Sequence, residues 1–270
     1  MVELYLRDDL KSAWRGRDPF EVVWSLRGET FRAVASRRTI RFEEGGAVYF
    51  AKIHDGVGWG EIVKNLVSGK APVTGSRHEY VACRRLAAEG IRAPRVAAFG
   101  RRGLSPARVR SFVVCDALEG YASLEDLTDA WRTCPPRPAV RRALVLALAD
   151  LTRALHAAGV NHRDYYLCHV LADTQALERG EAVLAVIDLH RAQVRPRTPR
   201  RWVLRDLAAL LFSTLHLGLS RKDRLRFLVR YTGLPLREAL RRDPGLWRRV
   251  ERRAERLLEK AVRHGIARPA

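Results

Sequence analysis

Two short segments of the chain place histidine and aspartate where they could do acid–base and metal chemistry. Residues 162–169 read His-Arg-Asp-Tyr-Tyr-Leu-Cys-His, and residues 186–188 read Val-Ile-Asp. In kinase-type phosphate transfer, one aspartate meets the attacking hydroxyl and a second aspartate holds the Mg²⁺ that bridges the phosphates of ATP. We therefore predict that Asp164 is the catalytic base and that Asp188 binds the metal.

The elements predicted around the first segment suit this chemistry. A helix is predicted over residues 139–158, where leucines recur at intervals of three and four, and Gly159 is a natural end for it. Two short apolar runs, 170–172 and 184–187, predict a buried hairpin with Gly180 in its turn. The alternative is a helix followed by an unrelated hairpin. The leucines of the helix are Leu144, Leu148, Leu151 and Leu155.

The N-terminal half contains a candidate phosphate-binding lysine. Residues 39–43 and 48–53 are β-type runs joined by Glu44-Gly45-Gly46-Ala47, which predicts a hairpin. Lys52 near the end of the second run would pair with the α- and β-phosphates. Taken alone, it is better interpreted as an exposed lysine at a strand end. No G-x-G-x-x-G precedes it, so phosphate contact near residues 35–38 would come from backbone N–H groups or from arginine.

A helical carboxylate is needed to hold Lys52 in place. Glu79 is the best candidate, in a predicted helix with Cys83, Leu86 and Ala87 on its buried side. Glu61 is the rival, since it opens an earlier predicted helix.

A predicted hinge follows the next apolar strand. This strand covers residues 111–115, and residues 116–120 then resemble the hinge whose backbone meets adenine. Asp116 and Leu118 are its candidate contacts. Gly56, Gly58 and Gly60 are interpreted as a connector into a helix over residues 62–66.

Length and composition favour one domain of two lobes. The chain has 270 residues and is 47% hydrophobic, which allows an ample core. We expect a small β-rich N-lobe over about residues 1–116 and a larger, mainly helical C-lobe over about 121–270. This is an α+β, protein-kinase-like fold. The beginning of the chain does not resemble a signal peptide, the longest apolar stretch is too short to span a bilayer, and the four cysteines have no metal or redox spacing. These features favour a reducing cytoplasm.

The charge is large and uneven. The net charge is +20, and residues 191–270 contain 22 Lys or Arg against 7 Asp or Glu. Such a surface attracts nucleic acid, an anionic membrane or an acidic partner or substrate. Over residues 246–262 we prefer a solvated helical face. The segment after Asp188 is different, because Pro196 and Pro199 predict an extended chain where a kinase binds its acceptor. Its arginines suit carboxylates and phosphates: Arg191, Arg195, Arg197, Arg200 and Arg201.

The acceptor segment is short. Only 17 residues separate Asp188 from Asp206, which is predicted to start an apolar helix and to anchor the catalytic loop. The segment has no Ala-Pro-Glu, and Thr198 is its sole hydroxyl residue. A regulated protein kinase needs a longer segment with a phosphorylation site. A kinase of small molecules or lipid-linked sugars is therefore favoured.

Several longer runs resemble the bacterial lipopolysaccharide core heptose(I) kinase family. They are residues 14–20, 37–43, 161–169, 186–193 and 199–202. The resemblance implies ATP-dependent transfer of phosphate to O4 of the first inner-core heptose, at the cytoplasmic face of the inner membrane. The heptose is joined through Kdo to lipid A, and acyl carrier protein is an implied partner, with no nucleic acid.

The resemblance also implies an unusual metal site. His169 stands where kinases have a second metal-binding asparagine, and Leu189-His190 replaces Phe-Gly. Two alternatives remain open. One is a protein kinase, possibly tyrosine-directed, and the other is a non-enzymatic basic binding module on a kinase fold.

Overall fold

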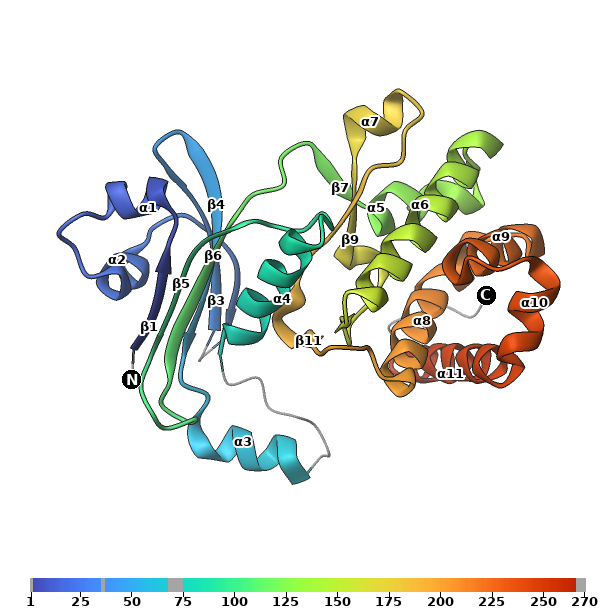
Figure 1. The fold of residues 1–270 in the computed structure, drawn as a ribbon. Coiled ribbons are helices and arrows are strands. Elements are labelled where there is room, and N and C mark those ends of the chain that lie inside the picture. Colours follow the sequence, from blue (N-terminus) through green and yellow to red (C-terminus); the bar gives the residue numbers. More distant parts are fainter. Residues whose placement is uncertain (1, 35–36, 68–74, 266–270) are drawn as a thin grey trace. The chain divides into compact units, whose positions relative to one another are not determined.

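The computed structural model describes residues 2–34, 37–67 and 75–265 (Figure 1). The chain divides into two compact units. The N-terminal unit consists of Met1–Ala87, Pro94–Leu118 and Leu189–Arg191. The C-terminal unit consists of Ala88–Ala93, Glu119–Asp188 and Ala192–Ala270.

A six-stranded antiparallel sheet forms the N-terminal unit, in the order β1-β5-β6-β4-β3-β2. The predicted hairpin is confirmed as β3 and β4. Gly45 and Gly46 have φ of 59° and 76°, which a two-residue type I′ turn requires and which glycine adopts without strain. The strands are β1 (Val2–Leu6), β2 (Glu29–Val34), β3 (Arg37–Glu44), β4 (Ala47–Asp55), β5 (Val96–Arg102) and β6 (Arg110–Asp116).

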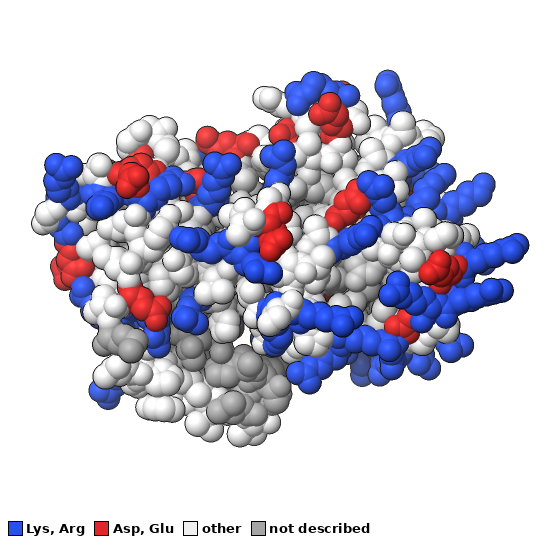
Figure 2. All heavy atoms as spheres, in the orientation of Figure 1, with Lys and Arg blue, Asp and Glu red and all other residues white. Residues whose placement is uncertain are grey.

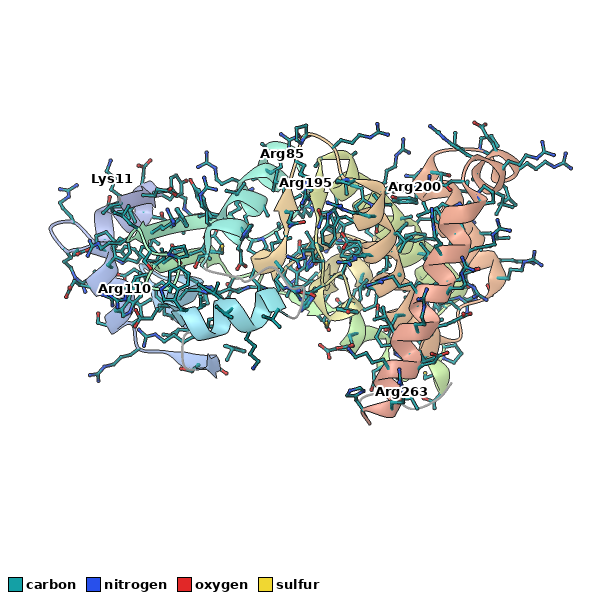
Figure 3. The ribbon with its side chains drawn as sticks, turned by 90° about the horizontal axis from the view of Figure 1, so that it is seen from below. Lys11, Arg85, Arg110, Arg195, Arg200 and Arg263 are labelled. Atoms are coloured by element: carbon teal, nitrogen blue, oxygen red, sulfur yellow. The ribbon has the colours of Figure 1, made fainter. Side chains whose placement is uncertain are left out.

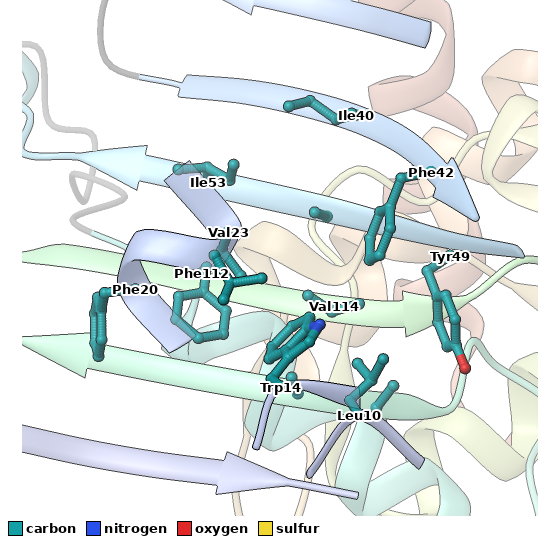
Figure 4. Close-up of a cluster of buried hydrophobic side chains, with 14 residues drawn as sticks. Leu10, Trp14, Phe20, Val23, Ile40, Phe42, Tyr49, Ile53, Phe112 and Val114 are labelled. Carbon is teal, nitrogen blue, oxygen red and sulfur yellow. The ribbon is translucent and has the colours of Figure 1, made fainter. Parts of the chain in front are cut away.

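Two short helices, α1 (Asp8–Ala13) and α2 (Pro19–Ser25), cover the sheet with a buried aromatic cluster (Figure 4). The rings of Phe20 and Phe112 meet edge-on, with centroids 5.1 Å apart. A Cβ at Gly100 would lie 2.4 Å from the Phe112 ring, so glycine on β5 makes room for this contact. Asp18 caps α2 by accepting a hydrogen bond from the Phe20 N–H at 2.9 Å.

Two further helices in this unit partly differ from the sequence prediction. The helix α4 (Arg77–Ala88) buries Cys83 and Leu86 as predicted, but Ala87 is exposed. The buried stripe instead passes through Ala82, one residue before Cys83. The helix α3 (Gly58–Val67) begins earlier than predicted, so Gly58 and Gly60 lie inside it and are not part of a connector.

The C-terminal unit is mainly helical. Its helices are α5 (Leu124–Thr128), α6 (Pro138–Ala157), α7 (Thr174–Glu178), α8 (Arg200–Thr214), α9 (Arg221–Thr232), α10 (Leu236–Arg242) and α11 (Pro244–Arg263). Its strands are β7 (Tyr121–Ser123), β8 (Val160–Asn161), β9 (Val170–Asp173), β10 (Leu184–Val186) and β11 (Gln193–Val194). The predicted leucine helix is α6, and the predicted buried hairpin is β9 with β10. The α+β class is therefore confirmed.

Gly159 makes the link between α6 and the strands possible. Its φ is 76°, and a Cβ there would lie 1.8 Å from the Arg195 carbonyl oxygen. Its own carbonyl accepts a hydrogen bond from the Arg195 N–H at 2.9 Å. Glycine thus ends the helix and lets the segment after β11 pack against it.

One prediction about the acceptor segment is wrong. The helix α8 begins at Arg200, directly after Pro199, and not at Asp206. Arg200 and Arg201 are therefore helical, and the extended stretch is shorter than the prolines suggested. Proline fixes φ near −65°, which suits a residue just before a helix as well as an extended segment.

No helix within the described residues has the length and apolar character needed to cross a membrane.

Candidate active site

A buried carboxylate holds the predicted catalytic loop. Asp206 on α8 is fully buried. Its Oδ2 accepts a hydrogen bond from the His162 backbone N–H at 2.7 Å, and its Oδ1 accepts one from the Arg163 N–H at 2.9 Å. This is the anchoring role predicted for Asp206. Two charge-assisted hydrogen bonds fix the backbone directly before Asp164.

His162 joins the catalytic loop to the segment that carries Asp188. Its ring is fully buried, and Nε2 lies 2.8 Å from the Ile187 carbonyl oxygen. Because a carbonyl can only accept, Nε2 carries the proton and donates it. Burial lowers the pKa of this imidazole, which keeps the ring neutral. The residue before Asp188 is thus tied to the loop that presents Asp164.

His169 lies between the two predicted catalytic aspartates. Its Nδ1 donates to the Asp164 carbonyl oxygen at 2.7 Å, and its Nε2 lies 3.5 Å from Asp188 Oδ2. The ring also stacks on His162, with centroids 5.5 Å apart and planes 10° apart. In the neutral ring with Nδ1 protonated, the lone pair of Nε2 faces the same space as the Asp188 carboxylate.

These donors fit a divalent cation. A carboxylate oxygen suits Mg²⁺, and a neutral imidazole nitrogen is an available although softer ligand. Within the part of the chain that the structure describes, no group of three or more His, Cys, Asp or Glu side chains forms a ready-made metal site. Phosphate oxygens and water would therefore have to complete the coordination.

Two residues of the predicted site have unusual backbone conformations. Arg163 and Asp188 have φ of 75° and 58°, a left-handed conformation that costs a non-glycine residue roughly 1–2 kcal/mol. The Arg163 N–H bond to Asp206 and the Ile187 N–H bond to the His169 carbonyl, 3.0 Å long, hold the two turns. Such strain concentrates at functional sites, and the spacing of the motifs does not reveal it.

The loop after Asp164 packs against α6 through Tyr165. Tyr165 is fully buried, and its hydroxyl lies 3.0 Å from that of Thr152 on α6. Burial, together with the nearby Glu125 carboxylate, raises the pKa of the Cys168 thiol to about 11. The thiol is therefore neutral at pH 7 and is a poor nucleophile.

In the N-terminal unit, Lys52 on β4 pairs with Glu79 on α4. Lys52 Nζ lies 2.8 Å from Glu79 Oε1, and Glu79 is 4% exposed. This is the partner that the sequence favoured. The side chain of the rival, Glu61, lies outside what the structure describes, as do residues 35 and 36 of the predicted hairpin tip.

The side chain of Asp116 has a partner that the sequence analysis missed. Its carboxylate accepts two hydrogen bonds from the Arg7 guanidinium, 2.7 and 2.8 Å long. Arg7 lies 109 positions earlier in the chain, so no local pattern could have paired the two residues. The predicted hinge segment, with half-buried Leu118, follows directly. The Ala117 N–H donates to the Val48 carbonyl of β4 at 2.9 Å.

The five predicted acceptor arginines lie in different surroundings. Arg195 donates to Asn161 Oδ1 at 2.7 Å and to Gln193 Oε1 at 2.8 Å, and Arg200 pairs with Asp243. Arg197 and Arg201 are exposed. Arg191 belongs to the N-terminal unit. The four arginines in the C-terminal unit therefore differ in exposure and in partners.

Comparisons with known proteins agree with one another. The model of the lipopolysaccharide kinase (Kdo/WaaP) family matches residues 21–231. Lipopolysaccharide core heptose(I) kinase WaaP of Pseudomonas aeruginosa is 49% identical over 265 residues, which cover 98% of this chain and 99% of the relative. WaaP of Escherichia coli is 42% identical over 267 residues, covering 98% and 100%. A solved structure of WaaP in complex with acyl carrier protein has a TM-score of 0.82 at 44% identity, covering 94% of this chain and 99% of that one.

Proposed function

The chain belongs to the lipopolysaccharide kinase (Kdo/WaaP) family, and on this premise we propose that it transfers the γ-phosphate of ATP to O4 of the first inner-core heptose. It is an ATP-dependent sugar kinase of lipopolysaccharide core biosynthesis, like the relatives of which it shares 42–49% of the sequence. The observation that carries the proposed phosphate transfer is one system of hydrogen bonds that holds the backbone at Asp164 and at Ile187, the residue before Asp188.

We assign Asp164 the role of general base. Its backbone is held at the N–H of Arg163 by Asp206 and at its own carbonyl by His169. A carboxylate fixed in this way can orient the heptose hydroxyl and accept its proton as the oxygen attacks, which contributes typically 10²–10⁴ to the rate.

Asp188 and His169 would hold Mg²⁺, which when bound offsets the charge on the phosphates. Lys52, held by Glu79, would pair with the α- and β-phosphates. Around adenine, the backbone of the segment from Asp116 to Leu118 would supply the hydrogen bonds. The Arg7 ion pair supports a backbone role, because it engages the Asp116 carboxylate. Since the Asp116 and Ala117 N–H groups donate to Arg95 and Val48, the Leu118 N–H would be the donor to the base.

The acceptor side would use arginine. Arg191, Arg195, Arg197, Arg200 and Arg201 follow Asp188 in the chain, and a guanidinium matches carboxylate and phosphate oxygens in pairs. Since the proposed acceptor is joined to lipid A, the enzyme would work at the cytoplasmic face of the inner membrane as a peripheral protein.

Acyl carrier protein is the proposed protein partner. The support is a solved structure of WaaP in complex with acyl carrier protein. This chain is 44% identical to the WaaP chain of that structure. The helices α9, α10 and α11 offer a surface for an acidic partner, since their outward faces carry many arginines and the buried face of α11 packs through Leu246, Val250 and Ala254. Figure 2 shows Lys and Arg side chains crowding this part of the C-terminal unit.

The two alternative functions are not favoured. The full-length similarity to heptose kinases argues against a protein kinase. The Lys52–Glu79 ion pair and the ordered Asp164 loop argue against a basic module that has lost catalysis.

The test is phosphate transfer to core lipopolysaccharide treated first with phosphatase. We expect incorporation of one phosphate per acceptor, at O4 of the first heptose by NMR of the product, and little incorporation into untreated core. Phosphate at another sugar would refute the assigned position. Phosphate transfer to a protein acceptor, with none to the sugar, would refute the proposal.

A further inference from the structure

Four arginines surround one tryptophan in the C-terminal unit, and we propose that this group binds an oxyanion carried by the acceptor beside its reacting hydroxyl. The group, called here the Trp202 cluster, comprises Trp202 with Arg163, Arg195, Arg201 and Arg205. The inference rests on the proposed function and deepens it. It selects two of the five arginines named from the sequence and adds Arg205 and Arg163.

The geometry of the cluster is that of guanidinium groups placed on an aromatic platform. The four Cζ atoms lie 4.7 Å (Arg205), 5.3 Å (Arg163), 5.8 Å (Arg201) and 5.9 Å (Arg195) from the centroid of the Trp202 ring. Contacts within about 6 Å are attractive cation–π interactions. One indole therefore gathers four cations that would otherwise repel one another.

Two of the four arginines in the cluster have no carboxylate partner among the described residues. Arg195 donates to the neutral oxygens of Asn161 and Gln193. Among the described residues, neither Arg201 nor Arg205 forms an ion pair, and they lie four positions apart on α8, where like charges repel. Arg200, by contrast, is neutralised by Asp243. Figure 3 labels Arg195, which follows β11, and Arg200, the first residue of α8.

The surroundings add positive potential. The first turn of α8 contains no acidic residue and has no side-chain cap, so its free N–H groups favour an anion. Arg253 on α11 has a buried Nε with no partner among the described residues. Burial and the nearby Arg205 and Arg256 lower the pKa of Arg253. An anion bound among Arg205, Arg253 and Arg256 would reduce the repulsion between their charges.

The cluster is coupled to the catalytic loop. Arg163 directly precedes Asp164, and Asp206, which holds the Arg163 N–H, follows Arg205 on α8. One helix thus supplies both the anchor of the base and two arginines of the cluster. An oxyanion held here would fix the acceptor relative to Asp164, as productive positioning requires.

The oxyanion has two possible sources on the proposed acceptor. One is the carboxylate of an acidic sugar next to the heptose, and the other is a phosphate of the lipid anchor. A guanidinium fork matches both groups. Three phosphatase-treated acceptors separate them: the intact acceptor, one whose carboxyl groups are reduced to alcohols, and one whose lipid phosphates are removed.

The test compares the full-length double variant R201Q/R205Q with wild type by steady-state kinetics. On the intact acceptor we expect KM to rise about tenfold or more, because the variant removes two guanidinium groups that would bind the oxyanion; tenfold corresponds to about 1.4 kcal/mol. The KM for ATP should stay within about twofold, which corresponds to less than 0.5 kcal/mol. The acceptor that lacks the bound group should erase the difference between variant and wild type, and this identifies the source.

Two controls keep the test decisive. The double variant R15Q/R17Q removes the same charge from exposed positions just after α1 and should leave the acceptor KM near wild type. R205K retains charge without the fork, so it should give an intermediate KM and a normal melting temperature. Equal KM changes on all three acceptors, or equal changes in R15Q/R17Q, would overturn the inference. Wild-type enzyme that phosphorylates none of the acceptors would instead refute the proposed function.

Discussion

At the scale of single residues, histidine organises the loop that carries the proposed chemistry. His162 holds Ile187, while His169 holds Asp164 and faces Asp188. Because both rings are hydrogen-bonded through one nitrogen to a carbonyl, the position of each proton follows from its partner. The loop is therefore braced by hydrogen bonds from two imidazole rings to backbone carbonyls.

The proposed metal role of His169 can be separated from its bracing role. We expect His169→Asn to retain most of the kcat and to need less Mg²⁺, because an amide oxygen is a better ligand for this hard cation than imidazole. His169→Ala should raise the Mg²⁺ concentration at half-maximal rate. The measurement is initial rate against free Mg²⁺ at saturating ATP. Equal losses of kcat in both variants, with the Mg²⁺ dependence unchanged, would show that the side chain only braces the loop.

At the scale of elements, α8 supports the proposed catalytic loop. It carries Asp206 and Ser213, whose hydroxyl accepts from the Leu167 N–H at 3.2 Å. The same helix packs on α11 through Leu207, Ala208 and Val250. The position of the proposed base therefore depends on the packing of α8 against α11, far from the motif in sequence.

This dependence predicts the effect of Asp206→Asn. An amide has one oxygen where the carboxylate has two and lacks its charge, so one of the two buried N–H bonds is lost. We expect the free energy of unfolding to fall by about 2 kcal/mol and kcat to fall at least tenfold, as measured by denaturant titration and steady-state kinetics. Asp150→Asn, which breaks the exposed ion pair with Arg230, is the control and should change neither value appreciably. Unchanged kcat in Asp206→Asn would contradict the anchoring role.

Patterns that are local in sequence predicted these elements well. The conformation of each of these segments depends mainly on its own residues. They are the leucine-spaced helix α6, the Gly45-Gly46 turn and the apolar strands β9 and β10. The start of α8 was missed because Pro199 suits both an extended segment and the residue before a helix. Long-range partners such as Arg7 and Asp116, and the arginines around Trp202, depend on the folded chain, and periodicity does not contain that information.

At the scale of the whole molecule, the chain combines a kinase site with a net charge of +20. In the N-terminal unit, Lys52 forms an ion pair with Glu79. The C-terminal unit contains the Asp164 loop and most of the excess arginines. The division suits an enzyme that acts on an anionic acceptor, because charge complementarity speeds the encounter and orients the substrate.

The central claim is that Asp164 is the base for phosphate transfer to the heptose, and kcat of Asp164→Asn tests it most directly. Asparagine keeps the shape of the side chain but cannot accept the proton. With phosphatase-treated core lipopolysaccharide as acceptor, kcat should fall by about 10²–10⁴, while the dissociation constant for ATP with Mg²⁺, measured by calorimetry, stays near that of the wild type. Near-normal turnover by Asp164→Asn would contradict the account.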